Sequence, residues 1–321
     1  MKGLIYTKDG LFEVREVKKP MPKANQVLIK VKSSAITNME YMRFGGGALP
    51  RVLNMVSKAT GKTLGIEVAG IVEEVGKNVT KFKQGDEVFG LTSGMRGGWA
   101  EYAIANEKEV FLKPSTLSFE QAGAIPVGGI TALGAVRAAK IKQGQDVLVY
   151  GASGSVGQYA VQLAKALGAT VTGVCSTRNL EVVRSIGADD VIDYKKEDFT
   201  KKGKTYDVII AVNGYNPLSA YNKLLNKGGK YVVVGGIKQA MLGVLGIPIY
   251  SIGRGKKFGA AAFPMVPKQA ALADLKAFAD GGKIKPYIDN VYSVRDTMKA
   301  MEYIVKEHAQ GKVVIDMDFN N

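Results

Sequence analysis

The clearest indication of the fold is the segment Asp146-Val-Leu-Val-Tyr-Gly-Ala-Ser-Gly-Ser-Val-Gly-Gln-Tyr-Ala-Val-Gln-Leu-Ala-Lys-Ala-Leu167. A short apolar run predicts a strand, the glycines predict a tight turn, and apolar positions at helical spacing predict a helix after it. Strand, glycine turn and helix in this order are typical of a dinucleotide-binding βαβ unit. Glycines let the backbone approach a pyrophosphate, and free N–H groups at the helix N-terminus attract its charge.

The spacing of these glycines is G-x-x-G-x-x-G rather than the usual G-x-G-x-x-G, so the glycines alone also fit a plain structural turn. A second apolar run over Gly168 to Cys175 follows at the distance of the next parallel strand. We therefore predict that the turn binds the phosphates of a nicotinamide dinucleotide. The residues expected at the cofactor are Gly151, Ser153, Gly154, Ser155, Val156 and Gly157.

The end of the second strand indicates which dinucleotide binds. A site for NAD places Asp or Glu here to hold the ribose 2′-hydroxyl, whereas a site for NADP supplies Arg. Ser176, Thr177 and Arg178 follow the strand, and the next carboxylate is Glu181, inside a predicted helix. Arg178 can hold a phosphate through two hydrogen bonds, with hydroxyl donors beside it. This predicts NADP(H); the alternative is a helix cap at Ser176 and a solvated Arg178.

The spacing of the apolar residues divides the chain into a β-rich region and a region of alternating strands and helices. Short apolar runs separated by turns predict a β-rich lobe up to about Pro114. Strands of four to six residues then alternate with helices, which predicts a doubly wound parallel sheet, the Rossmann fold. The fold class is therefore α/β, with a Rossmann domain over residues 126–263 inserted in a β-rich domain of residues 1–125 and 264–321. The strands expected in the sheet are Asp146–Tyr150, Thr170–Cys175, Val191–Asp193, Asp207–Val212, Lys230–Gly235 and Lys257–Ala262.

Composition excludes several classes of protein. One cysteine, Cys175, and one histidine, His308, exclude an internal disulfide and any zinc site built from several Cys or His ligands. No apolar run reaches the roughly 18 residues of a membrane span, and no secretory signal begins the chain, so a cytoplasmic protein is expected. The net charge of +15 fits a solvated basic surface; the lysines form no single tract, which argues against a nucleic acid as partner.

Further motifs extend over nearly the whole chain. They are Gly65-Ile-Glu-Val-Ala-Gly-Ile-Val-Glu-Glu-Val-Gly76, Gln84-Gly-Asp-Glu-Val-Phe-Gly90, Gly98-Trp-Ala-Glu-Tyr102, Ile125-Pro-Val-Gly-Gly-Ile-Thr-Ala132, Ser185-Ile-Gly-Ala-Asp189 and His308-Ala-Gln-Gly-Lys-Val-Val-Ile315. With them the chain resembles the zinc-independent medium-chain dehydrogenases/reductases, in their quinone oxidoreductase and enone reductase branch. The resemblance implies a GroES-like β-rich catalytic domain, a cofactor cleft where the lobes meet and a homodimer formed through the Lys257–Ala262 edge.

The resemblance also implies cofactor contacts outside the turn. Thr131 and the pair Gly235 and Gly236 are expected at the nicotinamide, Tyr194 near the adenosine, and Phe263 where the chain passes the cofactor. Each residue also has a purely structural reading, since a helix face, a strand-end turn or the core explains it equally well.

The reaction follows from the metal ligands that the sequence lacks. Relatives that oxidise alcohols hold zinc with Cys, His and an acid, and this chain has Gly65-Ile-Glu67 where they have Gly-His-Glu. No metal site is predicted. The acceptor expected is one that delocalises the incoming charge itself, a quinone or an α,β-unsaturated carbonyl. The alternatives are reduction of an enoyl thioester, and a nucleic-acid-binding or crystallin-like protein that keeps the cofactor fold.

Two side chains are candidate proton donors to the substrate. Thr37 occupies a place where relatives often carry Asn, and Tyr41 either hydrogen-bonds a substrate carbonyl or packs beneath a loop. Solvent is the alternative donor. The glycine-rich, basic and apolar stretch from Arg43 to Lys62 predicts a mobile loop over the substrate mouth.

Overall fold

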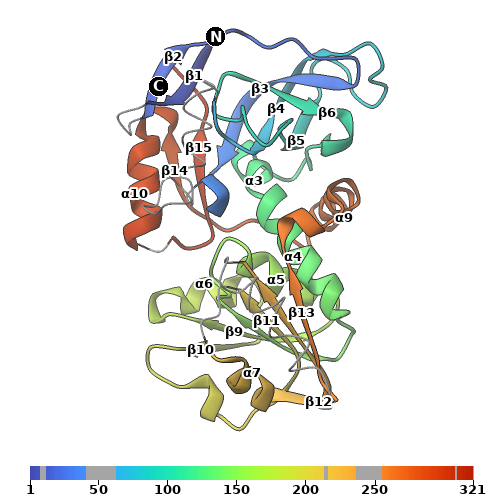
Figure 1. Ribbon diagram of the computed structural model, residues 1–321, viewed down its shortest axis with the longest axis vertical. Coiled ribbons are helices and arrows are strands. Elements are labelled where there is room, and N and C mark those ends of the chain that lie inside the picture. Colours follow the sequence, from blue (N-terminus) through green and yellow to red (C-terminus); the bar gives the residue numbers. More distant parts are fainter. Residues whose placement is uncertain (8–11, 41–62, 213–215, 236–254, 308, 321) are drawn as a thin grey trace. The chain divides into compact units, whose positions relative to one another are not determined.

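The computed structural model describes residues 1–7, 12–40, 63–212, 216–235, 255–307 and 309–320 (Figure 1). They form two compact units, Met1–Val127 with Ile288–Asn321, and Gly128–Tyr287. The second unit extends beyond the predicted boundary at Phe263. The reason is that α9 (Lys268–Asp280) shares a groove with α4 (Pro126–Ala139) and α5 (Gly157–Ala166), which precede and follow the first strand of its sheet.

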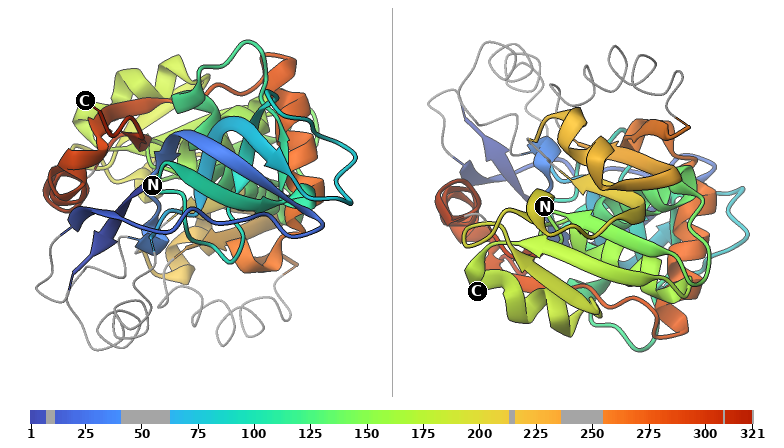
Figure 2. Two further views of the ribbon diagram at one scale, coloured as in Figure 1. Left: turned by 90° about the horizontal axis from the view of Figure 1, so that it is seen from above. Right: turned by 90° about the horizontal axis from the view of Figure 1, so that it is seen from below.

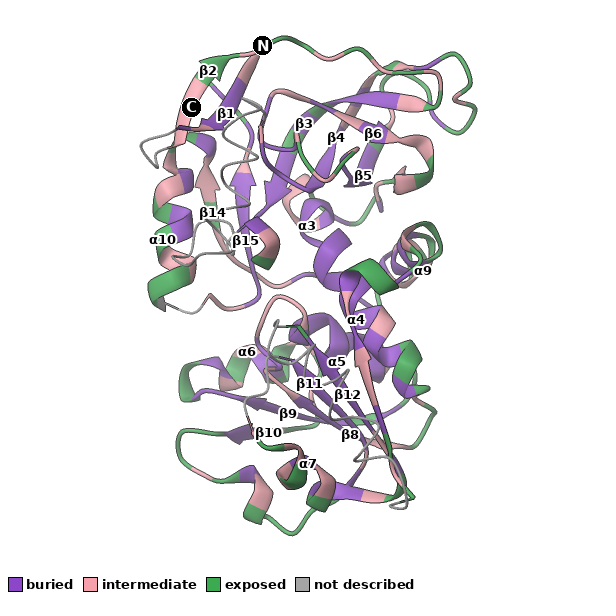
Figure 3. Cartoon of the chain, in the orientation of Figure 1, coloured by how far each residue is buried: buried purple, intermediate pink, exposed green. Residues whose placement is uncertain are grey.

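The second unit is built on a six-stranded parallel sheet. Its strand order, β10-β9-β8-β11-β12-β13, is that of a Rossmann fold, with the order reversing between β8 and β11. The central strands are buried along most of their length (Figure 3). The strands are β8 (Asp146–Tyr150), β9 (Thr170–Cys175), β10 (Asp190–Asp193), β11 (Tyr206–Val212), β12 (Leu225–Val234) and β13 (Lys257–Ala261). All six strands predicted from the sequence are therefore present.

Helices cover both faces of this sheet (Figure 2). A Cβ on Gly173 of β9 would meet Val183 of α6 (Leu180–Ser185), so this helix packs closely on that face. The next residue along β9, Val174, points to the other face and belongs to the core cluster of Tyr221 from α7 (Leu218–Leu224). The sheet is thus doubly wound, as the alternation of strands and helices predicted. Short 3-10 turns complete the unit: η2 (Thr177–Asn179), η3 (Phe199–Lys201) and η4 (Phe263–Met265).

The first unit is β-rich, and the C-terminal residues complete it. Its seven-stranded sheet has the order β14-β15-β3-β4-β5-β7, with β6 also paired to β3, and a separate pair joins β1 to β2. Strand β15 pairs antiparallel with β3, placing Val314 opposite Ala35, so the predicted return of the tail to this lobe is confirmed. The strands are β1 (Lys2–Tyr6), β2 (Phe12–Glu16), β3 (Gln26–Ala35), β4 (Glu67–Val75), β5 (Glu87–Leu91), β6 (Tyr102–Asn106), β7 (Val110–Leu112), β14 (Ile288–Ser293) and β15 (Lys312–Asp316).

The helical stretch from Phe119 to Ala139 is two helices. A capping box at Ser118 and Gln121 starts α3 (Phe119–Ala124), and α4 begins at Pro126. Proline has no N–H to continue a helix and favours the first helical position, which explains the break between them. The first unit also holds η1 (Glu107–Glu109), η5 (Val294–Asp296) and α10 (Thr297–Glu307). Within the described ranges, every helix is too short or too polar to cross a bilayer.

Candidate functional site

The turn after β8 has a geometry that only glycine allows at two positions. Gly151 has a φ of +74°, and a Cβ there would lie 2.5 Å from the carbonyl oxygen of Val212. A Cβ on Gly157 would lie 2.0 Å from the carbonyl oxygen of Gly151, so a side chain would push α5 away from the turn. Gly154 differs, because its nearest neighbour is 3.5 Å away and the space above it is open. The turn is thus closed on the protein side and open to a ligand.

The N-terminus of helix α5 lies at this turn. Its N-cap residue, Val156, provides no capping side chain, and the first turn carries no acid. The N–H groups of Gln158 and Tyr159 already donate to the carbonyls of Gly154 and Val156, so the N–H groups left for a ligand are those just before them, from Ser155 to Gly157. The helix dipole adds positive potential there, so the predicted turn residues from Ser153 to Gly157 fit the phosphates of a dinucleotide.

A buried polar contact supports the turn from the next strand. The Nδ2 of Asn179 donates to Ser153 Oγ at 2.7 Å, and Asn179 is 6% exposed. Its Oδ1 is buried and has no hydrogen-bond partner among the described residues. A buried acceptor left unpaired costs about 1–3 kcal/mol, so a donor from a bound molecule, such as a ribose hydroxyl, fits this position. In the sequence, Asn179 carries no sign of this role, since one Asn after a strand resembles an ordinary helix cap.

After β9, the Thr177 hydroxyl differs from expectation, because it has a partner within the protein. The Thr177 hydroxyl donates to Asp193 Oδ2 at 2.6 Å, so its proton is already engaged. This O–H donor holds the pKa of the Asp193 carboxyl below its usual range, and the N–H of Lys195 adds to the effect. Asp193 ends β10, opposite Cys175 in the parallel pairing. Asp193 does not follow β9 in the sequence, so only the parallel register of the two consecutive strands indicates that it lies beside Thr177.

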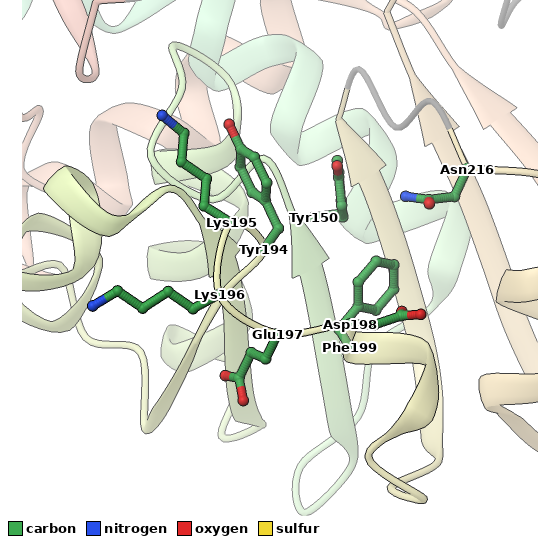
Figure 4. A pocket seen from close by; sticks show the side chains of 8 residues that line it. All are labelled: Tyr150, Tyr194, Lys195, Lys196, Glu197, Asp198, Phe199 and Asn216. Carbon is green, nitrogen blue, oxygen red and sulfur yellow. The ribbon is translucent and has the colours of Figure 1, made fainter.

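A pocket of about 490 Å³ lies beside these strand ends (Figure 4). The rings of Tyr150 and Tyr194 stack at its edge, with centroids 6.3 Å apart and planes 28° apart. Lys195 and Lys196 also line it, and Tyr194 is 47% exposed. Flat aromatic rings with nearby cations suit a heteroaromatic base that carries a phosphate. The contact of Tyr194 with adenosine stays a prediction, and the composition of this pocket suits it.

The remaining predicted cofactor residues lie elsewhere in this unit. Thr131 is buried on α4, Phe263 is buried in η4, and Gly235 follows β12 with a φ of +81°. Gly236 lies outside the described residues. None of the three described residues lines the pocket beside Tyr194, so the nicotinamide contacts of Thr131 and Gly235 and the cofactor contact of Phe263 stay predictions.

The first unit contains a buried ion pair that the sequence analysis did not foresee. Lys312 Nζ lies 2.6 Å from Glu67 Oε2, and both side chains are completely buried. The second carboxylate oxygen, Oε1, accepts from the Val127 N–H at 2.7 Å. Burial raises the pKa of Glu67 to about 7, although Lys312 and this N–H favour the charged form. These contacts give Glu67 a structural role.

A second buried carboxyl group belongs to Glu40, and it holds Thr37. Glu40 Oε2 accepts from the Thr37 N–H at 2.8 Å and makes a very short contact with the Thr37 hydroxyl; Oε1 accepts from the Ile66 N–H at 3.0 Å. Glu40 is 1% exposed, and burial raises its pKa above the usual range. Tyr41 and the predicted loop from Arg43 to Lys62 lie outside the described residues.

Comparisons with known proteins give matches in both units. The sequence matches the model of an alcohol dehydrogenase GroES-like domain over residues 23–115 and that of a zinc-binding dehydrogenase over residues 186–315. It is 34% identical to the quinone oxidoreductase of Sus scrofa over 309 residues, covering 92% of this chain and 90% of the relative. It is 33% identical to the 2-methylene-furan-3-one reductase of Solanum lycopersicum, covering 98% of this chain and 79% of the relative.

A solved structure shows the same fold over nearly the full length. The quinone oxidoreductase from Coxiella burnetii superposes with a TM-score of 0.84 at 27% sequence identity, covering 98% of this chain and 99% of that one.

Proposed function

The chain belongs to the zinc-independent quinone oxidoreductase branch of the medium-chain dehydrogenases/reductases, and from this we propose that it is an NADPH-dependent reductase of quinones or α,β-unsaturated carbonyls. The observation that carries the proposal is the glycine turn, where a side chain on Gly157 would collide with Gly151 while the space at Gly154 is open. This is the arrangement a pyrophosphate needs at a helix N-terminus.

The choice of NADP over NAD rests on charge at the adenosine end. Arg178 follows β9, and Lys195 and Lys196 line the pocket beside Tyr194, so three cations accompany the expected 2′-phosphate. Two carboxylates also line this pocket, Glu197 and Asp198, and each is paired with a lysine outside it, Lys202 and Lys201. The carboxylate at the end of β10, Asp193, already accepts from Thr177 and from the Lys195 N–H. Its hydrogen-bonding capacity is therefore partly used within the protein, which favours a phosphate over a ribose hydroxyl as the group recognised.

The acceptor class follows from the groups available to stabilise charge. The nicotinamide, when bound, supplies a hydride. The chain has one cysteine and one histidine, and Cys175 is buried at the end of β9, where burial raises the pKa of its thiol to about 11. The negative charge that the hydride brings has no cluster of metal-ligating Cys and His to stabilise it. A quinone or an enone spreads that charge over its own oxygen, and two relatives carry names of this kind.

The decisive experiment is a screen for NADPH oxidation by the full chain. We expect activity with quinones, enals or enones, and a lower rate with NADH. An enoyl-CoA in the same screen tests the thioester alternative. Failure of all quinones, enals and enones while an acyl-CoA reacts would replace the proposed substrate class. Failure of every acceptor, with no NADPH binding, would overturn the function.

A further inference from the structure

Three ionisable side chains are buried together in the first unit. Glu40 comes from the turn after β3, Glu67 from the start of β4 and Lys312 from the start of β15, and each is at most 1% exposed. Their charges act on one another: Lys312 favours the ionised form of both carboxyl groups, and Glu40 disfavours that of Glu67. Two carboxylates and one ammonium would leave a net negative charge in the core, which is costly. The cluster is neutral when it holds one extra proton.

The geometry indicates which carboxyl group carries that proton. Glu67 touches Lys312 directly at 2.6 Å and accepts from the Val127 N–H, so its charge is compensated. In the described part of the chain, Glu40 has no direct cationic partner and accepts only from groups of Thr37 and Ile66. Glu40 is thus the less compensated carboxylate, while burial raises the pKa of both carboxyl groups.

The protonation state of Glu40 decides what the Thr37 hydroxyl can do. When Glu40 is ionised, it has no proton to give, and the Thr37 hydroxyl must donate to it. When Glu40 is protonated, its carboxylic O–H can donate to Thr37 Oγ1, and the threonine proton becomes free for another acceptor. Thr37 Oγ1 also accepts from the Met39 N–H at 3.2 Å, which keeps the hydroxyl oxygen in place.

We propose that Glu40 holds one proton at neutral pH and passes it through the Thr37 hydroxyl to the substrate oxygen after hydride addition. This rests on the proposed reductase function and adds the proton source to it. The electron pair of the hydride forms a C–H bond at the substrate, and the C=C or quinone π electrons move onto oxygen. That oxygen takes the Thr37 proton, and Thr37 Oγ1 takes the Glu40 proton. Glu40 is left as a carboxylate, which regains a proton from water.

The resting proton can be measured without any activity. The infrared spectrum of the full chain at neutral pH is expected to show the carbonyl band of a buried protonated carboxylic acid. Glu40→Gln should lose this band, because without the Glu40 carboxyl no second acid opposes the ionisation of Glu67 beside Lys312, and Thr37→Val should keep it. The matched control is Glu16→Gln, whose carboxylate is 80% exposed in the same unit and should leave the band unchanged. A band that is absent, or that survives in Glu40→Gln, overturns the inference. Circular dichroism of each variant separates this result from misfolding.

The relay itself is tested by the pH dependence of turnover with NADPH and whichever quinone or enone reacts. In the wild type, kcat should fall as rising pH removes the Glu40 proton. Among the described residues, the charged groups that act on Glu40 are Glu67 on β4 and Lys312 on β15. Glu40→Gln should lower kcat by about 100-fold, remove this pH-dependent fall and leave KM for NADPH unchanged. Glu40→Asp should recover part of the rate, and Thr37→Val should not.

The outcomes separate the two proposals. If the wild type reduces none of the acceptors, the proposed function fails, while the infrared band still shows whether Glu40 stores a proton. If the wild type is active and Glu40→Gln keeps the wild-type kcat and pH profile, the relay is overturned and the function stands.

Discussion

Lys312 and Glu67 lie 245 positions apart in the sequence, yet their charged atoms are 2.6 Å apart in the core of the first unit. The pair joins β15 to β4 across β3, which lies between these strands in the sheet. It therefore ties the C-terminal strand to the part of the chain that precedes the Rossmann unit.

Removing Lys312 is expected to lower the free energy of unfolding severely. Lys312→Met leaves a buried carboxylate without its cation, and breaking such a pair typically costs about 3–5 kcal/mol of unfolding free energy. Combining it with Glu67→Gln should restore much of the loss, because no uncompensated charge remains. Urea denaturation measures both. The control is Lys306→Met, which breaks the exposed pair with Glu302 and should cost no more than about 1 kcal/mol. Equal losses in Lys312→Met and Lys306→Met would contradict the importance of the buried pair.

The same carboxyl group predicts how stability depends on pH. The pKa of Glu67 is about 7 in the folded protein and near 4.5 when unfolded, so between these values the folded state binds more protons. The stability that Glu67 contributes to the folded state is fully present below pH 4.5 and is lost as pH rises through about 7. The pKa of Glu40 is also raised, so Glu40 acts in the same direction. Unfolding free energy should therefore decrease across this range, and the Glu67→Gln/Lys312→Met double variant should show a smaller decrease. A wild-type stability that rises with pH here would contradict the assignment.

Two glycines of the turn are expected to respond differently to the same substitution. Gly157→Ala places a methyl group against the Gly151 carbonyl and should destabilise the fold, because backbone must move. Gly154→Ala meets nothing closer than 3.5 Å within the protein, so it should fold normally and lose NADPH affinity, since its methyl group enters the space of the pyrophosphate. Thermal denaturation and fluorescence titration with NADPH separate the two effects. Full NADPH affinity in Gly154→Ala would exclude the turn as the phosphate site.

The sequence predicted the sheet because its signals are local. An apolar run such as Val147 to Val149 or Val208 to Ala211 reports its own burial, and glycines mark the turn beside it. The charged contacts are not local. Asp193 meets Thr177 only because β9 and β10 pair in a particular register, and Lys312 meets Glu67 only once the C-terminal strand has joined the first sheet. A lone lysine beside an apolar strand gives no indication in sequence of its partner, which is why the buried cluster appeared only in the structure.

Cofactor preference provides the last prediction, and it separates Arg178 from Asp193. Arg178→Ala should weaken NADPH binding by about 100-fold, the effect of losing two charge-assisted hydrogen bonds, and should leave NADH binding nearly unchanged because NADH has no 2′-phosphate. Asp193→Asn should act in the opposite direction: it removes a negative charge beside the expected phosphate and no longer holds the Thr177 hydroxyl as strongly, so NADPH should bind more tightly. Lys276→Ala provides the control, since Lys276 pairs with Asp280 on α9 and neither residue lines this pocket. Titration of each variant with both cofactors measures the ratio of affinities.

Two outcomes would contradict these assignments. An NADPH preference that is the same in wild type and Arg178→Ala would remove Arg178 from the site. A loss of NADPH affinity in Asp193→Asn would show that this carboxylate positions Thr177 for the cofactor instead of repelling its phosphate.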